Sequence, residues 1–131
     1  MAAKKRAPKA PKVRGGGRYS ESEYFSFIRS GLRAKSNRWP VKYDVLNAAK
    51  RPYKGPNKRQ KFEWQCNVCK KWVVGKEISI DHITPAGSLK CFADLPRFVE
   101  TLLCEADNLQ AICSVCHHAK TQQERKARND N

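Results

Sequence analysis

The sequence has no long apolar run. The stretch Trp72-Val73-Val74 is typical of its longest apolar segments, whereas a membrane-spanning helix needs about 20 such residues and a secretory signal needs about 7–15. The sequence therefore predicts neither a membrane span nor a signal peptide. We expect a soluble, intracellular protein without a membrane partner. At 131 residues, the chain has room for one domain with a tail.

Acidic residues are scarce, above all in the first half of the chain. Residues 1–61 contain 18 Lys and Arg but three Asp and Glu, whereas residues 62–131 contain nine of each kind. A one-sided positive charge of this size favours a polyanionic partner, most often nucleic acid. The alternative is a solvated, solubilising arm. For a short Lys-rich tail considered alone, the two interpretations are equally good.

The basic half divides into a tail and a helical segment. Residues 1–18 are rich in Lys, Arg, Ala, Pro and Gly and have almost nothing to bury, so a disordered basic tail is predicted. Ser20 and Glu23 form a capping-box pattern that predicts a helix over 21–34. Pro40 suits the first turn of a second helix. With the loop 51–61, residues 19–61 are expected to form a basic helical extension.

Residues 62–129 alternate between strand and helix patterns. The segment 62–65 is strand-like, and residues 71–74 and 77–83, separated by Gly75-Lys76, predict a β-hairpin. Pro96 can open a helix, and a last helix is expected to begin near Ser114 and to run through the 120s. The sequence therefore predicts an α+β domain over 62–129.

Four of the six cysteines form two CxxC pairs, Cys66 with Cys69 and Cys113 with Cys116. In a reducing compartment this spacing is typical of metal binding, and four thiolates suit tetrahedral Zn²⁺. A site closed by four protein ligands predicts a structural zinc. The alternative is four unrelated buried cysteines. Cys91 and Cys104 stand alone in apolar surroundings and are predicted to lie in the core.

A closed zinc site leaves the three histidines unexplained. His82 follows Asp81 on the second arm of the expected hairpin, His117 and His118 open the last helix, and Asn108 lies nine residues before His117. Neighbouring strand residues point to opposite faces, so one can bind a metal while the other handles a proton. Each pattern alone has a plainer interpretation: a strand-end Asp-His pair, and an asparagine that caps a turn.

The order CNVC…IDHITP…DNLQAICSVCHHAKT resembles the HNH nuclease pattern in its four-cysteine subfamily. The resemblance spans Cys66 to Thr121 and implies a ββα-metal (His-Me finger) core with a β-hairpin, a C-terminal helix and a structural zinc. The flanking segments are similar to small HNH proteins encoded by tailed bacteriophages. The chain departs from the pattern by an isoleucine before Cys113 and by a long insert between His82 and Asn108.

Carried over to this chain, the resemblance implies a DNA endonuclease that works with one divalent metal, Mg²⁺, Mn²⁺, Ni²⁺ or Zn²⁺. His82 would be the general base, and the side-chain carbonyl of Asn108 would hold its other ring nitrogen. Asp81 and His117 would bind the catalytic metal. Helical geometry agrees, because His117 lies about 100° round the helix from Cys116. Lys120 lies on the same face of the helix as His117 and could contact a phosphate, whereas His118 points away from Cys116.

DNA is the expected partner, and the phage terminase or packaging machinery is a further candidate partner. If it is phage-encoded, the protein is expected in the cytoplasm of the infected bacterial host. The residues expected to hold the DNA backbone are Lys120, Arg29, Arg33, Arg38, Arg51, Lys54, Lys58, Arg59 and Lys61. No recognition helix is evident, so low sequence specificity is expected. Two other classes stay open: a non-catalytic, zinc-stabilised DNA-binding accessory protein, and a zinc-held protein scaffold. The sequence does not predict an oligomeric state. It also does not predict whether the enzyme would nick one strand or cleave both.

Overall fold

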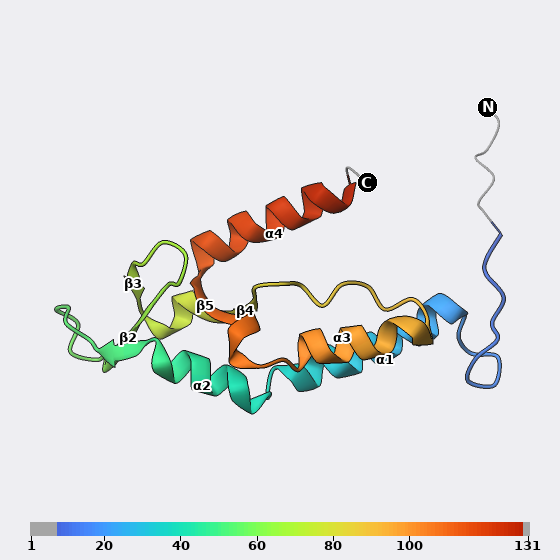
Figure 1. Cartoon of the computed structure of the whole chain (residues 1–131), viewed down its shortest axis with the longest axis horizontal. Coiled ribbons are helices and arrows are strands. Elements are labelled where there is room, and N and C mark those ends of the chain that lie inside the picture. Colours follow the sequence, from blue (N-terminus) through green and yellow to red (C-terminus); the bar gives the residue numbers. More distant parts are fainter. Residues whose placement is uncertain (1–7, 130–131) are drawn as a thin grey trace.

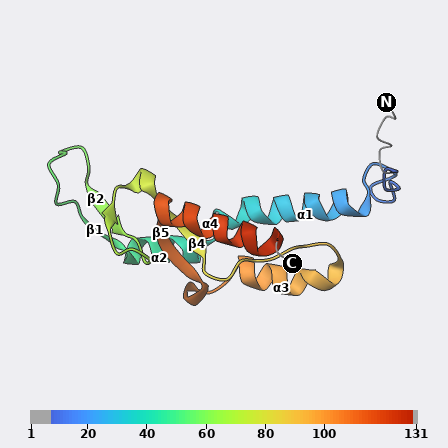
Figure 2. The same ribbon diagram turned by 90° about the horizontal axis from the view of Figure 1, so that it is seen from above.

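A computed structural model of this chain describes residues 8–129. The helices and the strands follow one another along an elongated molecule (Figures 1 and 2). The helices are α1 (Glu21–Ser36), α2 (Pro40–Ala48), α3 (Leu95–Leu102) and α4 (Ser114–Asn129). The strands are β1 (Lys50–Pro52), β2 (Phe62–Gln65), β3 (Trp72–Val73), β4 (Ile78–His82) and β5 (Leu109–Cys113). The α+β class predicted from the sequence is therefore confirmed. None of the helices in the described range has the length and apolar composition to cross a membrane.

The segment that precedes α1 differs from the disordered tail that was predicted. Residues 1–7 lie outside the described residues, but Arg14 and Tyr19 form a β-bridge. Ion pairs join Lys12 to Glu23 and Arg14 to Glu21. The acidic first turn of α1 therefore gives the basic tail partners within its own chain, which its composition alone does not reveal.

The predicted capping box of α1 is confirmed. Ser20 is the N-cap, its side chain accepts a hydrogen bond from the backbone N–H of Glu23, and the Glu23 carboxylate accepts from the Ser20 backbone N–H. Pro40 stands in the first turn of α2, as expected. These local signals place both helices correctly. The Ser20–Glu23 cap satisfies backbone groups that no intrahelical partner can reach, and Pro40 has no N–H that would need a partner in the first turn.

The main apolar core joins α1 to the insert. Phe25 of α1 and Phe98 and Leu102 of α3 are almost fully buried, and Ala86 and Leu89 of the connecting segment complete the cluster. Figure 2 shows α1 and α3 side by side. The long insert between His82 and Asn108 is therefore a packed element that covers α1.

The β1–β2–β3 sheet lies at the other end of the molecule (Figure 1). Strand β1 pairs with β2 in antiparallel register, so the pairing crosses residue 61, where the extension was expected to end. The core shared by α1 and α3 crosses the same expected boundary. The division into an extension over 19–61 and a separate core over 62–129 is therefore not seen in the packing.

The predicted hairpin between residues 71–74 and 77–83 is wrong. Strand β3 pairs with β2, while β4 pairs with β5 over the register Ile78↔Cys113 to His82↔Leu109. Residues Gly75–Glu77 form a 3₁₀ turn, and Gly75 lacks the positive φ that a tight hairpin turn requires. Strand β4 therefore pairs with β5, which begins 31 residues after the start of β4 and immediately precedes α4.

Candidate functional site

The four cysteines of the CxxC pairs come together beside β5. All four Sγ atoms lie within 4.8 Å of one another, and the Sγ atoms of Cys69 and Cys113 are 3.8 Å apart. A tetrahedral ion with bonds of about 2.3 Å holds neighbouring sulfurs about 3.8 Å apart. Cys66, Cys69, Cys113 and Cys116 can therefore hold a structural metal ion such as zinc. It is the one such cluster of three or more ligands within residues 8–129.

The pKa values of Cys66 and Cys116 in this cluster are shifted in opposite directions. Burial works to raise the pKa of the Cys66 thiol, but backbone hydrogen bonds from Cys113, Cys69 and Val68 lower that pKa to about 6. The hydrogen bond with the Cys113 thiol, together with burial and the other two sulfurs, raises the pKa of Cys116 to about 12. The Cys66 thiolate therefore forms readily, whereas the Cys116 thiolate needs a nearby positive charge to offset its repulsion by the other sulfurs.

The two cysteines outside the pairs differ from each other. Cys104 is buried, as predicted, and its carbonyl accepts a hydrogen bond from Trp39 Nε1. Cys91 is exposed just before α3, so its predicted core position is wrong. Leu89 turns into the core, whereas Cys91 and its neighbour Phe92 stay exposed.

Asp81 and His117 come together where β4 lies beside the start of α4. Asp81 lies at the end of β4 and His117 in the first turn of α4, with Asp81 Oδ1 and His117 Nε2 3.8 Å apart. The Asp81 side chain is 14% exposed and that of His117 is 48% exposed. Two bonds of about 2.1 Å can span up to about 4.2 Å, so one divalent ion can bridge this pair.

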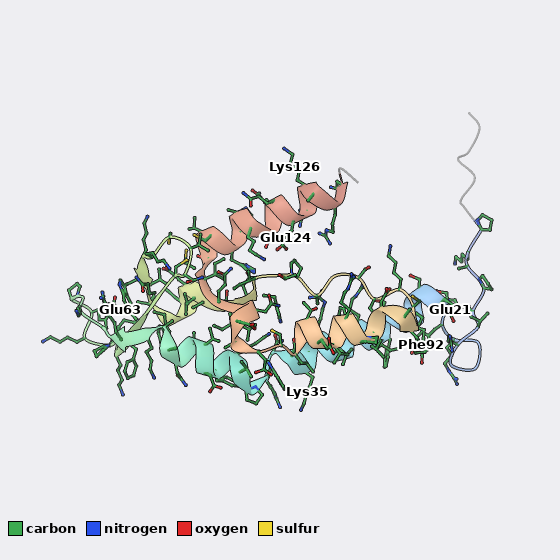
Figure 3. All side chains as sticks on the ribbon, viewed as in Figure 1. Glu21, Lys35, Glu63, Phe92, Glu124 and Lys126 are labelled. Carbon is green, nitrogen blue, oxygen red and sulfur yellow. The ribbon has the colours of Figure 1, made fainter. Side chains whose placement is uncertain are left out.

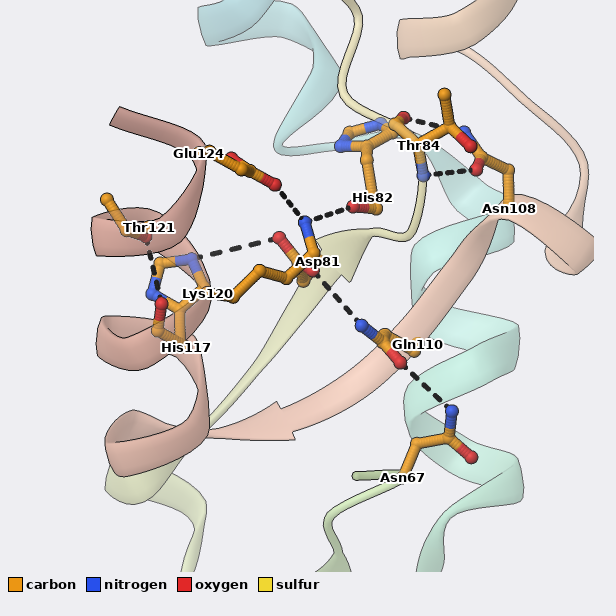
Figure 4. Close-up of polar contacts among 10 residues, drawn as sticks. All are labelled: Asn67, Asp81, His82, Thr84, Asn108, Gln110, His117, Lys120, Thr121 and Glu124. Atoms are coloured by element: carbon orange, nitrogen blue, oxygen red, sulfur yellow. Dashed lines mark hydrogen bonds and ion pairs between the residues drawn. The ribbon is translucent and has the colours of Figure 1, made fainter. Parts of the chain in front are cut away.

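A lysine ammonium lies against the same carboxylate. Lys120 Nζ is 3.1 Å from Asp81 Oδ2, donates to the His82 carbonyl at 3.0 Å and pairs with Glu124 (Figure 4). Burial works to lower the pKa of Lys120, but the hydrogen bonds to Glu124 and Asp81 raise it above its ordinary value. Lys120 therefore carries its charge at neutral pH and balances Asp81.

The imidazole of His82 is held by a backbone carbonyl. His82 Nε2 lies 2.7 Å from the carbonyl oxygen of Leu102. A carbonyl can only accept, so Nε2 carries the hydrogen and the neutral ring keeps its basic lone pair on Nδ1. The ring is thereby fixed in the tautomer that can accept a proton through Nδ1.

Asn108 does not have the role that the resemblance implies. Its Oδ1 accepts from the Thr84 backbone N–H at 2.8 Å, and its Nδ2 donates to the Thr84 carbonyl at 3.2 Å. The hydrogen bonds of the described residues join the His82 ring to Leu102 instead. Because both ends of its amide bind the turn two residues after His82, Asn108 fixes the end of β4 rather than the imidazole.

Asp81, His82, His117 and Lys120 line a cleft of about 1110 Å³ between α4, α1 and the segment that leads into α3. Six basic side chains line it: Arg29, Arg33, Lys90, Arg97, Lys120 and Arg128. The acidic lining residues are Asp81 and Glu124. We call this the basic cleft. An excess of four positive charges around Asp81, His82 and His117 favours an anionic occupant.

The other basic residues predicted to hold DNA lie elsewhere. Arg38 is exposed after α1, and Lys54, Lys58, Arg59 and Lys61 are exposed in the β1–β2 loop, at the far end of the molecule (Figure 1). Arg51 is engaged internally, because its guanidinium is 2.9 Å from Glu63 and stacks over the Trp72 ring at 3.6 Å. Of the predicted set, Arg29, Arg33 and Lys120 line the basic cleft.

Several site residues were missed from the sequence. Glu124 follows Lys120 by four residues and His117 by seven, so helical spacing alone could have placed it on their face. Figure 3 shows Glu124 on the inner side of α4 and Lys126 on the outer side. Lys90 and Arg97 carry no local signal, since only the packing of the insert brings them to the cleft, whereas Arg128 follows Glu124 by four residues on the same face of α4.

Comparisons with protein-family models, with curated proteins and with solved structures find no match for this chain. The residues and their geometry therefore carry the functional argument.

Proposed function

We propose that this chain is a metal-dependent HNH endonuclease that hydrolyses DNA phosphodiester bonds with low sequence specificity. Strands β4 and β5 with α4 would be its ββα-metal core, and the four cysteines its structural zinc site. One observation carries the proposal: Asp81 Oδ1 and His117 Nε2 lie 3.8 Å apart, and both residues line the basic cleft together with His82. A purely structural zinc module has no need of that arrangement.

Asp81 and His117 would hold the catalytic divalent ion, for which Mg²⁺, Mn²⁺, Ni²⁺ and Zn²⁺ are the candidates. When bound, the ion would polarise the scissile phosphate and stabilise charge on the leaving 3′ oxygen. The ion would bind Asp81 Oδ1, which faces His117, whereas Lys120 lies against Oδ2. Glu124 also pairs with that ammonium, so Lys120 would keep a partner if the ion displaced it from Asp81.

His82 would act as the general base. With Nε2 bound to the Leu102 carbonyl, Nδ1 would take a proton from the water that attacks phosphorus. The 3′ oxygen then leaves and takes a proton from solvent, which gives 5′-phosphate and 3′-hydroxyl ends. A histidine suits this step because its unperturbed pKa lies near neutrality.

The basic cleft would hold the sugar-phosphate backbone. Arg29 and Arg33 approach from α1, Lys90 and Arg97 from the insert, and Arg128 from α4, so positive charge surrounds the proposed reaction centre on three sides. Contacts of this kind bind phosphates irrespective of base. They support a substrate that is DNA of little sequence preference.

The second candidate function is a non-catalytic, zinc-stabilised DNA-binding accessory protein. One observation favours it: Lys120 already neutralises Asp81 at 3.1 Å, as expected of a carboxylate whose role is structural. Under that alternative the cleft would bind DNA without cutting it.

Plasmid nicking separates the two. Supercoiled plasmid is incubated with wild-type protein or with His82→Ala in Mg²⁺, Mn²⁺ or Ni²⁺. We expect wild type to convert the plasmid to nicked or linear forms, and His82→Ala to be slower by about 10²-fold or more, the usual contribution of a general base. Equal rates for two proteins with the same zinc content and thermal unfolding would refute the nuclease.

A further inference from the structure

Beyond the residues above, a chain of side-chain amides runs from the four-cysteine cluster to Asp81. Asn67 stands inside the first CxxC turn, and its Nδ2 donates to Gln110 Oε1 at 2.9 Å. Gln110 Nε2 donates to Asp81 Oδ2 at 3.2 Å. Figure 4 shows the three side chains in line, with Asn67 and Asp81 on either side of Gln110.

The donor-to-acceptor direction of these side-chain hydrogen bonds is fixed at both ends. Lys70 Nζ lies 3.3 Å from Asn67 Oδ1, and an ammonium can only donate. Asn67 therefore presents its oxygen to Lys70 and its NH₂ to Gln110. Gln110 must then present its oxygen to Asn67 and its NH₂ to Asp81, whose carboxylate can only accept. Neither amide can turn over without losing a hydrogen bond.

The backbone holds the same residues in place. Gln110 lies directly opposite Asp81 in the β4–β5 register and is 8% exposed. The Asn67 backbone N–H donates to the Ala111 carbonyl at 2.8 Å, which docks the cysteine turn on β5. The cysteine turn, the buried amide and the carboxylate therefore form one continuous, ordered connection.

We propose that Lys70, Asn67 and Gln110 form an amide relay that positions Asp81, so that the cysteine turn sets the divalent-ion affinity of Asp81 and His117. Gln110 and Lys120 both contact Oδ2, and Oδ1 is directed at His117. This inference rests on the proposed function in one respect only: it takes Asp81 and His117 as the divalent-ion ligands. Gln110 and Asn67 are positioning residues, because neither would contact the substrate or the ion.

The test measures Mn²⁺ binding to zinc-loaded protein by electron paramagnetic resonance of free Mn²⁺. Gln110→Leu keeps the volume of the side chain and removes its hydrogen bonds. Because partners that orient metal ligands typically contribute 10–100-fold to affinity, we expect the Mn²⁺ dissociation constant to rise about tenfold or more. Nicking at saturating Mn²⁺ should recover, since the chemistry itself is unchanged.

Two further variants complete the design. Gln60→Leu is the matched control, because Gln60 lies in the β1–β2 loop, away from the basic cleft and from the relay residues. It should leave Mn²⁺ affinity unchanged. Asn67→Ala alters an exposed position and serves if Gln110→Leu does not fold. Loss of its hydrogen bond should weaken Mn²⁺ binding by about threefold or more.

The outcomes separate this inference from the nuclease proposal. If wild type nicks plasmid but Gln110→Leu and Asn67→Ala keep wild-type Mn²⁺ affinity, the relay is wrong and the nuclease stands. If wild type binds Mn²⁺ through Asp81 and His117, and the relay variants weaken that binding, the relay holds even when no plasmid is cut. If wild type binds no Mn²⁺, the relay is wrong, whereas the nuclease proposal is decided by nicking in Mg²⁺ or Ni²⁺.

Discussion

Replacing Cys113 by serine is the most informative test of the four-cysteine cluster. Cys113 ends β5, and its sulfur lies 3.8 Å from that of Cys69. Serine keeps the size of the side chain but offers a hydroxyl in place of the thiolate that zinc prefers. The variant therefore removes one of four ligands without a large change in packing.

The expected loss is large because little else holds this part of the molecule. The second core contains three buried residues, Cys66, Ile112 and Cys113, of which two are themselves members of the cluster. Structural zinc contributes about 10–16 kcal/mol of apparent binding energy in small zinc domains, comparable to the about 5–15 kcal/mol by which whole domains are stable. Losing even about 3 kcal/mol would lower the Tm by about 10 °C.

The assay combines zinc content by mass spectrometry with thermal unfolding by circular dichroism. Cys113→Ser should lose its zinc and unfold at least about 10 °C below wild type. Cys91→Ser is the matched control, since Cys91 is exposed and outside the cluster, and it should keep both the zinc and the Tm. A zinc-free Cys113→Ser protein with the wild-type Tm would refute the structural role of the metal.

Two further predictions concern charge. Arg29→Gln combined with Arg33→Gln should flatten the slope of log K against log salt by about 2, at about 0.9 per phosphate contact, and should slow nicking. Lys54→Gln with Lys58→Gln, at the far end, should weaken DNA binding alone; equal losses of nicking from both pairs would contradict the cleft as the DNA path. Hydrogen bonds from Lys12 and Ser20 lower the pKa of Glu23 to about 2. Its contribution to stability is therefore present above the ordinary pKa of 4.5 and is lost as the pH falls towards 2. A carboxyl titration by NMR should show a midpoint near 2, and a midpoint near 4 would contradict the Lys12 contact.

Local chemistry made parts of the fold predictable. The capping box at Ser20 and Glu23, the proline that opens α2, and the two CxxC pairs each depend on residues within a few positions of one another. Such signals act before the rest of the chain is placed, so the sequence carries them directly. The cysteine cluster followed because the spacing of its ligands matches what zinc requires.

The errors arose where distant segments meet. The partner of β4 is β5, and alternation within 77–83 says only that a strand forms, not which strand it joins. The sequence also does not reveal that the Leu102 carbonyl is the partner of the His82 ring, because α3 comes close to His82 only through its packing on α1. Gln110 was missed for this reason too: it faces Asp81 only once the β4–β5 register is known.

The two adjacent histidines, His117 and His118, test directly whether Asp81 and His117 share a catalytic cation. His117 is 3.8 Å from Asp81, whereas its neighbour His118 is exposed and lies away from the basic cleft. The measurement is the rate of metal-dependent plasmid nicking by His117→Ala and His118→Ala, both zinc-loaded. We expect His117→Ala to lose nearly all activity and His118→Ala to cut like wild type. Equal activity of the two variants would contradict the shared cation.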